Sequence, residues 1–200
     1  MHTLTLEGSQ TLLDVDLASD LVIELAPDAQ VQYCSVVGLQ QLVKRVHFKL
    51  ADRARLEVST VVVGAGEDQV VVDYTLHHMG RGTHAHTLVK GAFAGSANAE
   101  VFGLIQIDPS AQQTESFLEQ RALLLADAAR ANLQPKLQIE ADDVRASHAA
   151  TVGSLDAEQV FDAQTRGLPP MLAQRLVVQA FLFEAVSGIP PSPERTSLVV

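Results

Sequence analysis

The chain has 200 residues, of which 47% are apolar, and carries a formal net charge of −10 with a sequence pI near 5.0. This length and apolar content suit one elongated domain with a real core, which argues against general disorder. The acidic balance, with no basic cluster to offset it, disfavours nucleic-acid binding because it repels phosphate backbones. Tryptophan is absent and aromatic residues make up only 4%. The core must therefore be filled by Val, Leu, Ile and Ala, which suits thin, regularly stacked layers.

Alternating polar and apolar residues, many of them β-branched, predict β-strands from residue 1 to about residue 110. The clearest runs are 58–63 and 70–76. Small turn-forming residues separate the strands, and they stand at 64–66, 80–82 and 95–98. No long amphipathic helix is indicated before residue 155.

A weak internal repeat accompanies the strands. A small residue between polar neighbours precedes an apolar strand start at Ala29, Ala54, Ala99 and Ala131, at offsets of 25, 45 and 32 residues. We interpret these offsets as one or two turns of a coil with a period in the twenties. Repeats of that length indicate a solenoid, a class that includes β-helices.

The pattern changes to helix near the C-terminus. Asp156 with Gln159 three residues later is a capping-box pattern, and it predicts a helix over 157–166 that stops at Gly167. Two prolines then open a second helix, which we expect to end near residues 187–188. The predicted domains are a β-helix core over 1–155, a C-terminal helical segment over 156–189 and a flexible tail over 190–200.

A long segment before these helices carries a specific resemblance. It reads Gln134-Pro135-Lys136-Leu137-Gln138-Ile139-Glu140-Ala141-Asp142-Asp143-Val144-Arg145-Ala146-Ser147-His148-Ala149-Ala150-Thr151-Val152-Gly153. It resembles the SufD branch of the SufB/SufD family, whose pattern is Pro-x-Leu-x-Ile, Ala-Asp-Asp-Val and Cys-Ser-His-Gly-Ala-Thr-Val-Gly. The likeness extends over roughly residues 84–187.

This resemblance implies a right-handed parallel β-helix followed by C-terminal helices, in agreement with the periodicity. It implies a scaffold subunit of the SUF pathway, which assembles iron–sulfur clusters, and not an enzyme. Family members dimerise through the β-helix, as a pair with a SufB-like protein or with themselves, and bind SufC ATPase subunits through the helices. The candidate partner-binding residues are Phe161, Leu172, Leu176, Phe181 and Phe183. The alternative is that these side chains simply pack against the end of the β-helix.

The chain departs from the family pattern at the motif itself. The cysteine of the Cys-Ser-His motif is Ala146 here, and Ala149 replaces the following glycine. Of the residues that could hold a nascent cluster, His148 stays in register. By resemblance it would bind a metal or a transient iron–sulfur cluster at a dimer interface, with no cofactor intrinsic to the chain. The alternative is a β-helix interaction module that has lost the cluster chemistry.

A histidine cluster and the single cysteine each have a functional and a structural interpretation. His77, His78, His84 and His86 form a local cluster. Three of them, chiefly His77, His84 and His86, could hold a zinc or iron ion if the turn at 80–82 folds His77 or His78 toward the other two. The alternatives are solvent-facing strand residues or, as a third hypothesis, the site of a cupin-like metalloenzyme, in which the C-terminal motif would have no role. Cys34 lies in an alternating strand, and we interpret it as a small core residue.

The sequence also predicts a cellular location. The first residues lack the basic start and apolar run of a signal peptide. A single cysteine fits a reducing compartment, and no apolar stretch approaches the roughly 20 residues that span a membrane. We expect a cytoplasmic protein.

Overall fold

The computed structural model describes residues 2–14, 19–38 and 42–187. Within them, twelve strands precede two helices. The strands are β1 (His2–Leu6), β2 (Ser9–Asp14), β3 (Asp20–Leu25), β4 (Gln30–Val37), β5 (Val43–Leu50), β6 (Arg55–Gly64), β7 (Gln69–His78), β8 (His84–Phe93), β9 (Asn98–Ile107), β10 (Thr114–Leu124), β11 (Arg130–Ile139) and β12 (Val144–Ser154). The helices are α1 (Ala157–Thr165) and α2 (Pro170–Ser187).

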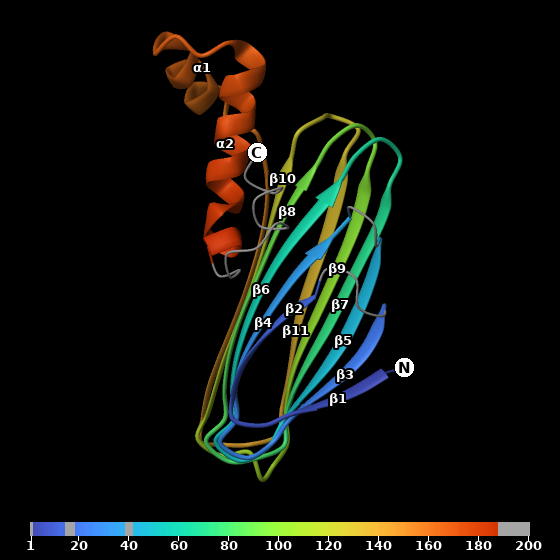
Figure 1. The fold of residues 1–200 in the computed structure, drawn as a ribbon, viewed down its shortest axis with the longest axis vertical. Helices are drawn as coiled ribbons and strands as arrows, with labels where there is room; N and C mark the ends of the chain where they lie inside the picture. The colour runs from blue at the N-terminus through green and yellow to red at the C-terminus, as the bar shows by residue number, and fades with distance from the viewer. Residues whose placement is uncertain (1, 15–18, 39–41, 188–200) are drawn as a thin grey trace.

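The strands form two six-stranded parallel sheets that face each other (Figure 1). The odd sheet has the order β1-β3-β5-β7-β9-β11, and the even sheet has the order β12-β10-β8-β6-β4-β2. Each strand pairs with the next strand but one, so the chain alternates between the sheets and adds one strand to each per turn. This is a β-solenoid with two C-terminal helices, and it confirms the predicted fold class.

The structure confirms two of the three offsets of the predicted repeat. Ala29 and Ala54 each precede a strand of the even sheet, and the N–H of Arg55 donates to the carbonyl of Ala29 across one turn. Ala99 and Ala131 are direct partners in the odd sheet. The offsets of 25 and 32 residues are therefore single turns. The offset of 45 joins two different corners of the coil, so its interpretation as whole turns was wrong.

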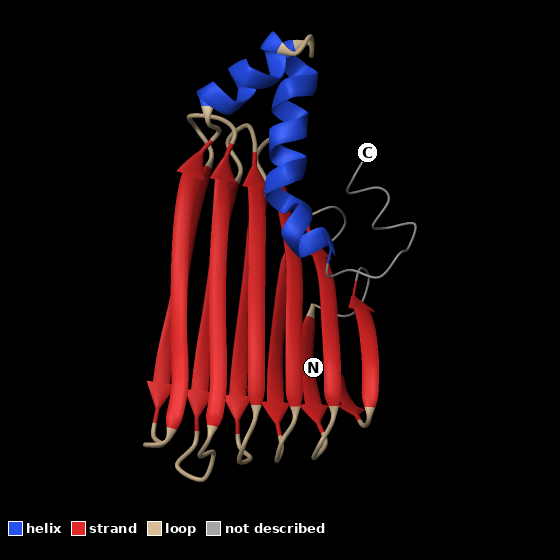
Figure 2. Ribbon diagram, turned by 90° about the vertical axis from the view of Figure 1, so that its left-hand side faces the viewer, coloured by secondary structure: helices blue, strands red, loops and turns tan. Residues whose placement is uncertain are grey.

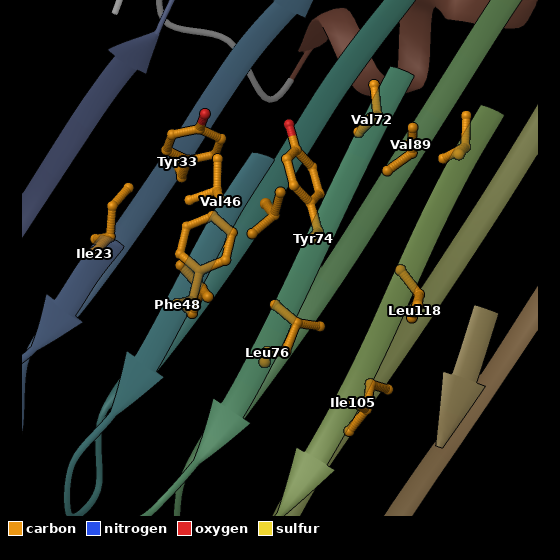
Figure 3. Close-up of a cluster of buried hydrophobic side chains, with 14 of the residues drawn as sticks. Ile23, Tyr33, Val46, Phe48, Val72, Tyr74, Leu76, Val89, Ile105 and Leu118 are labelled. Carbon is orange, nitrogen blue, oxygen red and sulfur yellow. The ribbon is translucent and has the colours of Figure 1, made fainter. Parts of the chain in front are cut away.

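Side chains of the two inner faces fill the space between the sheets (Figure 3). Tyr33, Phe48 and Tyr74 pack edge to face, with ring centroids 5.1 to 6.2 Å apart. Aliphatic side chains such as Ile105 and Leu118 extend the same layer along the solenoid. Buried residues alternate with more accessible ones along β7 and β9, as the period of two in a β-strand requires.

The interior of the first turns also holds a polar cluster. Asp14 forms a fully buried ion pair with Lys44, and the hydroxyl of Tyr33 donates to the same carboxylate. One turn deeper, the hydroxyls of Ser35, Thr60 and Tyr74 lie 2.8 to 3.0 Å from one another. Burial raises the pKa of Tyr74 to about 12. Hydrogen bonds among these groups offset the cost of removing them from water.

A second polar cluster lies inside the solenoid near the turn that joins β7 to β8. His78 points inward, where its Nδ1 lies 2.8 Å from Thr83 Oγ1 and its Nε2 lies 3.0 Å from Ser116 Oγ. Thr83 Oγ1 lies 2.7 Å from Thr114 Oγ1 in the next turn. Burial lowers the pKa of His78 to about 3, so the imidazole is neutral at physiological pH.

This buried histidine predicts acid sensitivity. The pKa of His78 is about 3 in the folded chain and near 6.5 when unfolded, so the unfolded state binds the proton first as pH falls. From pH 7 to pH 4, His78 should cost roughly 3 kcal/mol of unfolding free energy. Urea unfolding of His78→Gln at both pH values should show that much less acid sensitivity than wild type. The exposed control His86→Gln should be at least as acid-sensitive as wild type, because the pKa of His86 is raised in the folded chain. An unchanged trend in His78→Gln would contradict this assignment.

The two helices form as predicted from their local signals. The side chain of Asp156 accepts a hydrogen bond of 2.9 Å from the N–H of Glu158, which caps α1. Gly167, with φ of 92°, ends the turn after α1 and donates to the carbonyl of Gln164. The helix ends at Thr165, one residue before the predicted end. The predicted flexible tail over 190–200 lies outside the described residues.

Helix α2 packs on the outer face of the even sheet and extends past the strand ends, where α1 lies (Figure 2). A second apolar layer joins helix and sheet, and it comprises Cys34, Val36, Val61, Leu88, Ala92, Leu182, Ala185 and Val186. Burial raises the pKa of the Cys34 thiol to about 11, and this residue packs as the small core residue that we predicted. In the described part of the chain, no helix combines the length and apolar character needed to cross a lipid bilayer.

Candidate functional site

The last turn of the solenoid, formed by β11 and β12, leaves its inner face accessible at the end of both sheets. Leu137 and Ile139 are 38% and 39% exposed, whereas their partners one turn earlier, Ile105 and Ile107, are fully buried. Val152 on β12 is 44% exposed. We call this surface the terminal coil. It presents core-like apolar side chains to the outside, and such surfaces are typical of interfaces.

His148 lies in the middle of the terminal coil. Its register partner on β10 is Leu118, which is buried in the core, so His148 occupies the corresponding inward position one turn later. The side chain is exposed because no further turn covers it among the described residues. Ala146 and Ala150 flank it two residues away on the same face of the strand and leave its ring accessible. An accessible imidazole of this kind can act as a metal ligand.

The family cysteine position lies on the same face as His148. Ala146 is partly buried against the core and supplies no ligating atom. Along the inner face of the terminal coil, as far as the structure describes it, His148 is the side chain with a strong metal-ligating atom. No group of three or more His, Cys, Asp or Glu side chains is placed to hold a metal ion within residues 2–14, 19–38 and 42–187.

The structure does not bring the second predicted cluster together. His84 and His86 do share the outer face of the even sheet. His77 instead projects from the outer face of the odd sheet, because β7 and β8 belong to different sheets. The turn at 80–82 therefore joins two sheets and does not fold His77 back onto its sequence neighbours.

Carboxylates accompany two of these histidines across the even sheet. His84 Nδ1 lies 3.6 Å from Glu115 Oε2, and His86 Nδ1 lies 3.4 Å from Glu57 Oε2. The hydrogen bond with Glu57 raises the pKa of His86. Both pairs link neighbouring strands at direct register positions, so they act as cross-strand contacts.

The C-terminal helices expose a second apolar surface. Phe161 on α1 is 64% exposed, and Leu172 and Leu176 on α2 are 47% and 48% exposed. Leu172 and Leu176 are four residues apart, so they lie on one face of α2, and Phe183 continues the exposed apolar surface further along the helix. We call Phe161, Leu172 and Leu176 the hairpin surface. Several large apolar side chains exposed on the same pair of helices make this a candidate surface for partner binding.

Two other residues of this region lie outside the hairpin surface. Phe181 is partly buried against the even sheet, with its ring centroid 5.0 Å from Lys90 Nζ, so it supports the position of α2. Met171, which sequence reasoning missed, is the most exposed large apolar residue described, at 84%. It follows the helix-opening Pro170, where an apolar residue with no buried counterpart could have signalled an external contact.

Comparisons with known proteins decide the family. The model of the SUF system FeS cluster assembly SufBD core domain matches residues 17–181, which include nearly all of the solenoid and most of α2. The chain belongs to the SufB/SufD family. This confirms the resemblance found in the C-terminal motif and places the chain among SufD-like proteins of iron–sulfur cluster assembly.

Individual relatives agree with this assignment. The iron–sulfur cluster assembly protein SufD of Bacillus subtilis is 34% identical over 143 residues, which cover 72% of this chain and 33% of that protein. SufD of Escherichia coli is 33% identical over 106 residues, covering 53% of this chain and 25% of that protein. A SufBD family protein of Synechocystis is 39% identical over 94 residues, covering 47% of this chain and 21% of that protein. The chain thus spans a third or less of the length of these relatives.

Proposed function

We propose that this SufD-like chain is a non-catalytic scaffold subunit of iron–sulfur cluster assembly, which pairs through the terminal coil and binds a SufC-type ATPase through its helices. The family match carries this proposal, because it covers both surfaces in one continuous stretch. The sequence has no Walker A pattern, so ATP hydrolysis is assigned to the partner. The proposed setting is the cytoplasm.

The terminal coil supports pairing in two ways. As the last strands of their sheets among the described residues, β11 and β12 present backbone N–H and C=O groups along one edge. Leu137, Ile139 and Val152 add an apolar surface inside that edge. A second β-solenoid could add strands to both sheets and cover these side chains at once. The proposed occupant is a SufB-like protein or a second copy of this chain.

His148 lies at the centre of this proposed interface. Its imidazole is exposed here and would become enclosed on pairing, which would place a ligand between two proteins. The cluster would be cargo, held transiently, with the thiolate ligands supplied by the partner because Ala146 replaces the family cysteine.

Removing this imidazole tests the proposal. The chain, a SufB-like protein and a SufC-type ATPase from the same organism would be co-expressed and purified anaerobically, and iron and acid-labile sulfide would be measured per complex. We expect His148→Ala to form the same complex with most of its iron and sulfide lost. His86→Ala removes another exposed imidazole, from the outer face of the even sheet, and should retain both elements.

Each outcome separates the two candidate functions. A complex that contains iron and sulfide in wild type and in His148→Ala alike would remove His148 as a ligand. A stable complex that lacks both elements even in wild type would favour an interaction module that has lost the cluster chemistry, a function that the alanine at position 146 already favours. Failure of wild type to join any complex would contradict the scaffold function.

A further inference from the structure

Hydrophobic burial alone does not determine how α2 sits on the solenoid. The face toward the even sheet carries Val178, Phe181, Leu182, Ala185 and Val186. The face toward solvent carries side chains of comparable size, including Leu176 and Phe183. Because the hydrophobic effect is non-directional, rotating α2 about its axis would exchange one apolar face for another at little cost. A directional contact must therefore select the face.

Lys90 provides that contact. It projects outward from β8 into the apolar layer under α2, where its side chain is only 5% exposed. Its Nζ donates a hydrogen bond of 2.9 Å to the backbone carbonyl of Phe181 and lies 2.7 Å from Glu184 Oε2. The ring of Phe181 covers the same ammonium, with its centroid at 5.0 Å.

These contacts fix both rotation and position along the axis. Residues 181 and 184 are one turn apart, so they face Lys90 together only when one side of α2 lies on the sheet. In any other orientation of α2 on the even sheet, the buried Lys90 ammonium would lose these acceptors. Its desolvation would then be uncompensated, which disfavours those orientations. The cation also lies in the last turns of α2, where the helix dipole favours positive charge. Its proximity lowers the pKa of Glu184 and keeps that carboxylate ionised.

We infer that Lys90 is a positioning residue that selects the face of α2 lying on the even sheet and thereby holds the hairpin surface outward for its partner. The second half of this statement rests on the proposed function, whereas the first half concerns the chain alone. Lys90→Met would keep the length and apolar stem of the side chain and remove its charge. The solenoid should remain folded, and α2 should lose its unique seating.

The rate at which the Cys34 thiol is labelled measures how well α2 covers the even sheet. Cys34 is the only cysteine, it is fully buried, and it lies in the apolar layer that α2 covers. Labelling of the native protein by 5,5′-dithiobis(2-nitrobenzoic acid) at pH 8 should be about tenfold faster or more in Lys90→Met than in wild type, the factor expected from losing charge-assisted hydrogen bonds. Glu184→Gln, a change at an exposed side chain, should give a smaller acceleration. The melting midpoint of Lys90→Met should stay close to that of wild type. If Lys90 served only to stabilise the fold, the midpoint would fall.

Lys49→Met is the matched control. Lys49 pairs with Glu24 at 3.0 Å on the outer face of the odd sheet, away from α2. This variant should leave Cys34 labelling and ATPase binding unchanged, while Lys90→Met should also weaken ATPase binding. Unchanged labelling in Lys90→Met would overturn the inference whether or not the ATPase binds. If wild type fails to bind the ATPase, the proposed function fails, and faster labelling in Lys90→Met would still establish the seating role.

Discussion

Replacing Leu172 and Leu176 together by glutamate is expected to abolish the proposed binding of a SufC-type ATPase to this chain. Both side chains are about half exposed on one face of α2, so the changes leave the core intact. Each glutamate would place a charged carboxylate in an apolar contact that excludes water. The cost of desolvating each carboxylate would remove a large part of the binding free energy. We expect the dissociation constant to rise by at least about a hundredfold, as is typical when central apolar anchors of an interface are lost. Isothermal titration calorimetry with the purified ATPase would measure the change.

A control variant separates local from general effects. Met79 is 46% exposed in the turn after β7, at the end of the solenoid opposite the helices, and Met79→Glu should leave ATPase affinity unchanged. Circular dichroism should show that the double variant keeps the wild-type melting curve. Wild-type affinity in the double variant would mean that the ATPase binds elsewhere, and the hairpin surface would then need a different partner.

The local features of this fold could be predicted from the sequence because they depend on neighbouring residues. The cap at Asp156 and the stop at Gly167 are interactions within one or two turns of backbone, and the structure reproduces both. Strand alternation likewise depends on adjacent residues. The resemblance carried by the C-terminal motif implied a β-helix followed by helices, and this agreed with the fold class that the periodicity indicated.

The candidate sites could not be predicted equally well, because they depend on which strands become neighbours. Sequence proximity suggested that His77 would meet His84 and His86, as it would if a hairpin joined them. In a solenoid, consecutive strands enter different sheets, so a short turn separates residues that a hairpin would bring together. The contact between Lys90 and Phe181 spans 91 residues, and no local pattern marks it.

The buried pair of Asp14 and Lys44 also depends on which strands become neighbours, so no local pattern predicts it. Breaking this pair gives the largest expected effect on stability. Asp14→Leu should lower the free energy of unfolding by about 3 to 5 kcal/mol, because the Lys44 ammonium would stay buried without that carboxylate. Tyr33 would also lose the acceptor of its hydroxyl. The double variant Asp14→Leu/Lys44→Met should recover to within about 2 kcal/mol of wild type, since apolar replacement of a whole buried pair is close to neutral. Urea unfolding at pH 7 would measure all of these values.

The pH dependence gives an independent check on this pair. Burial lowers the pKa of Lys44, so its neutral form is favoured in the folded state more than in the unfolded chain. Stability linked to this depressed pKa is present above the unfolded value near 10.5 and is lost as pH falls through the folded value. Asp14→Leu should therefore regain part of its lost stability between pH 7 and pH 10. The partly exposed pair gives the comparison, because Glu24→Leu should cost less than about 1 kcal/mol. If Asp14→Leu cost no more than Glu24→Leu, the buried pair would not be needed to hold the first turns of the solenoid together.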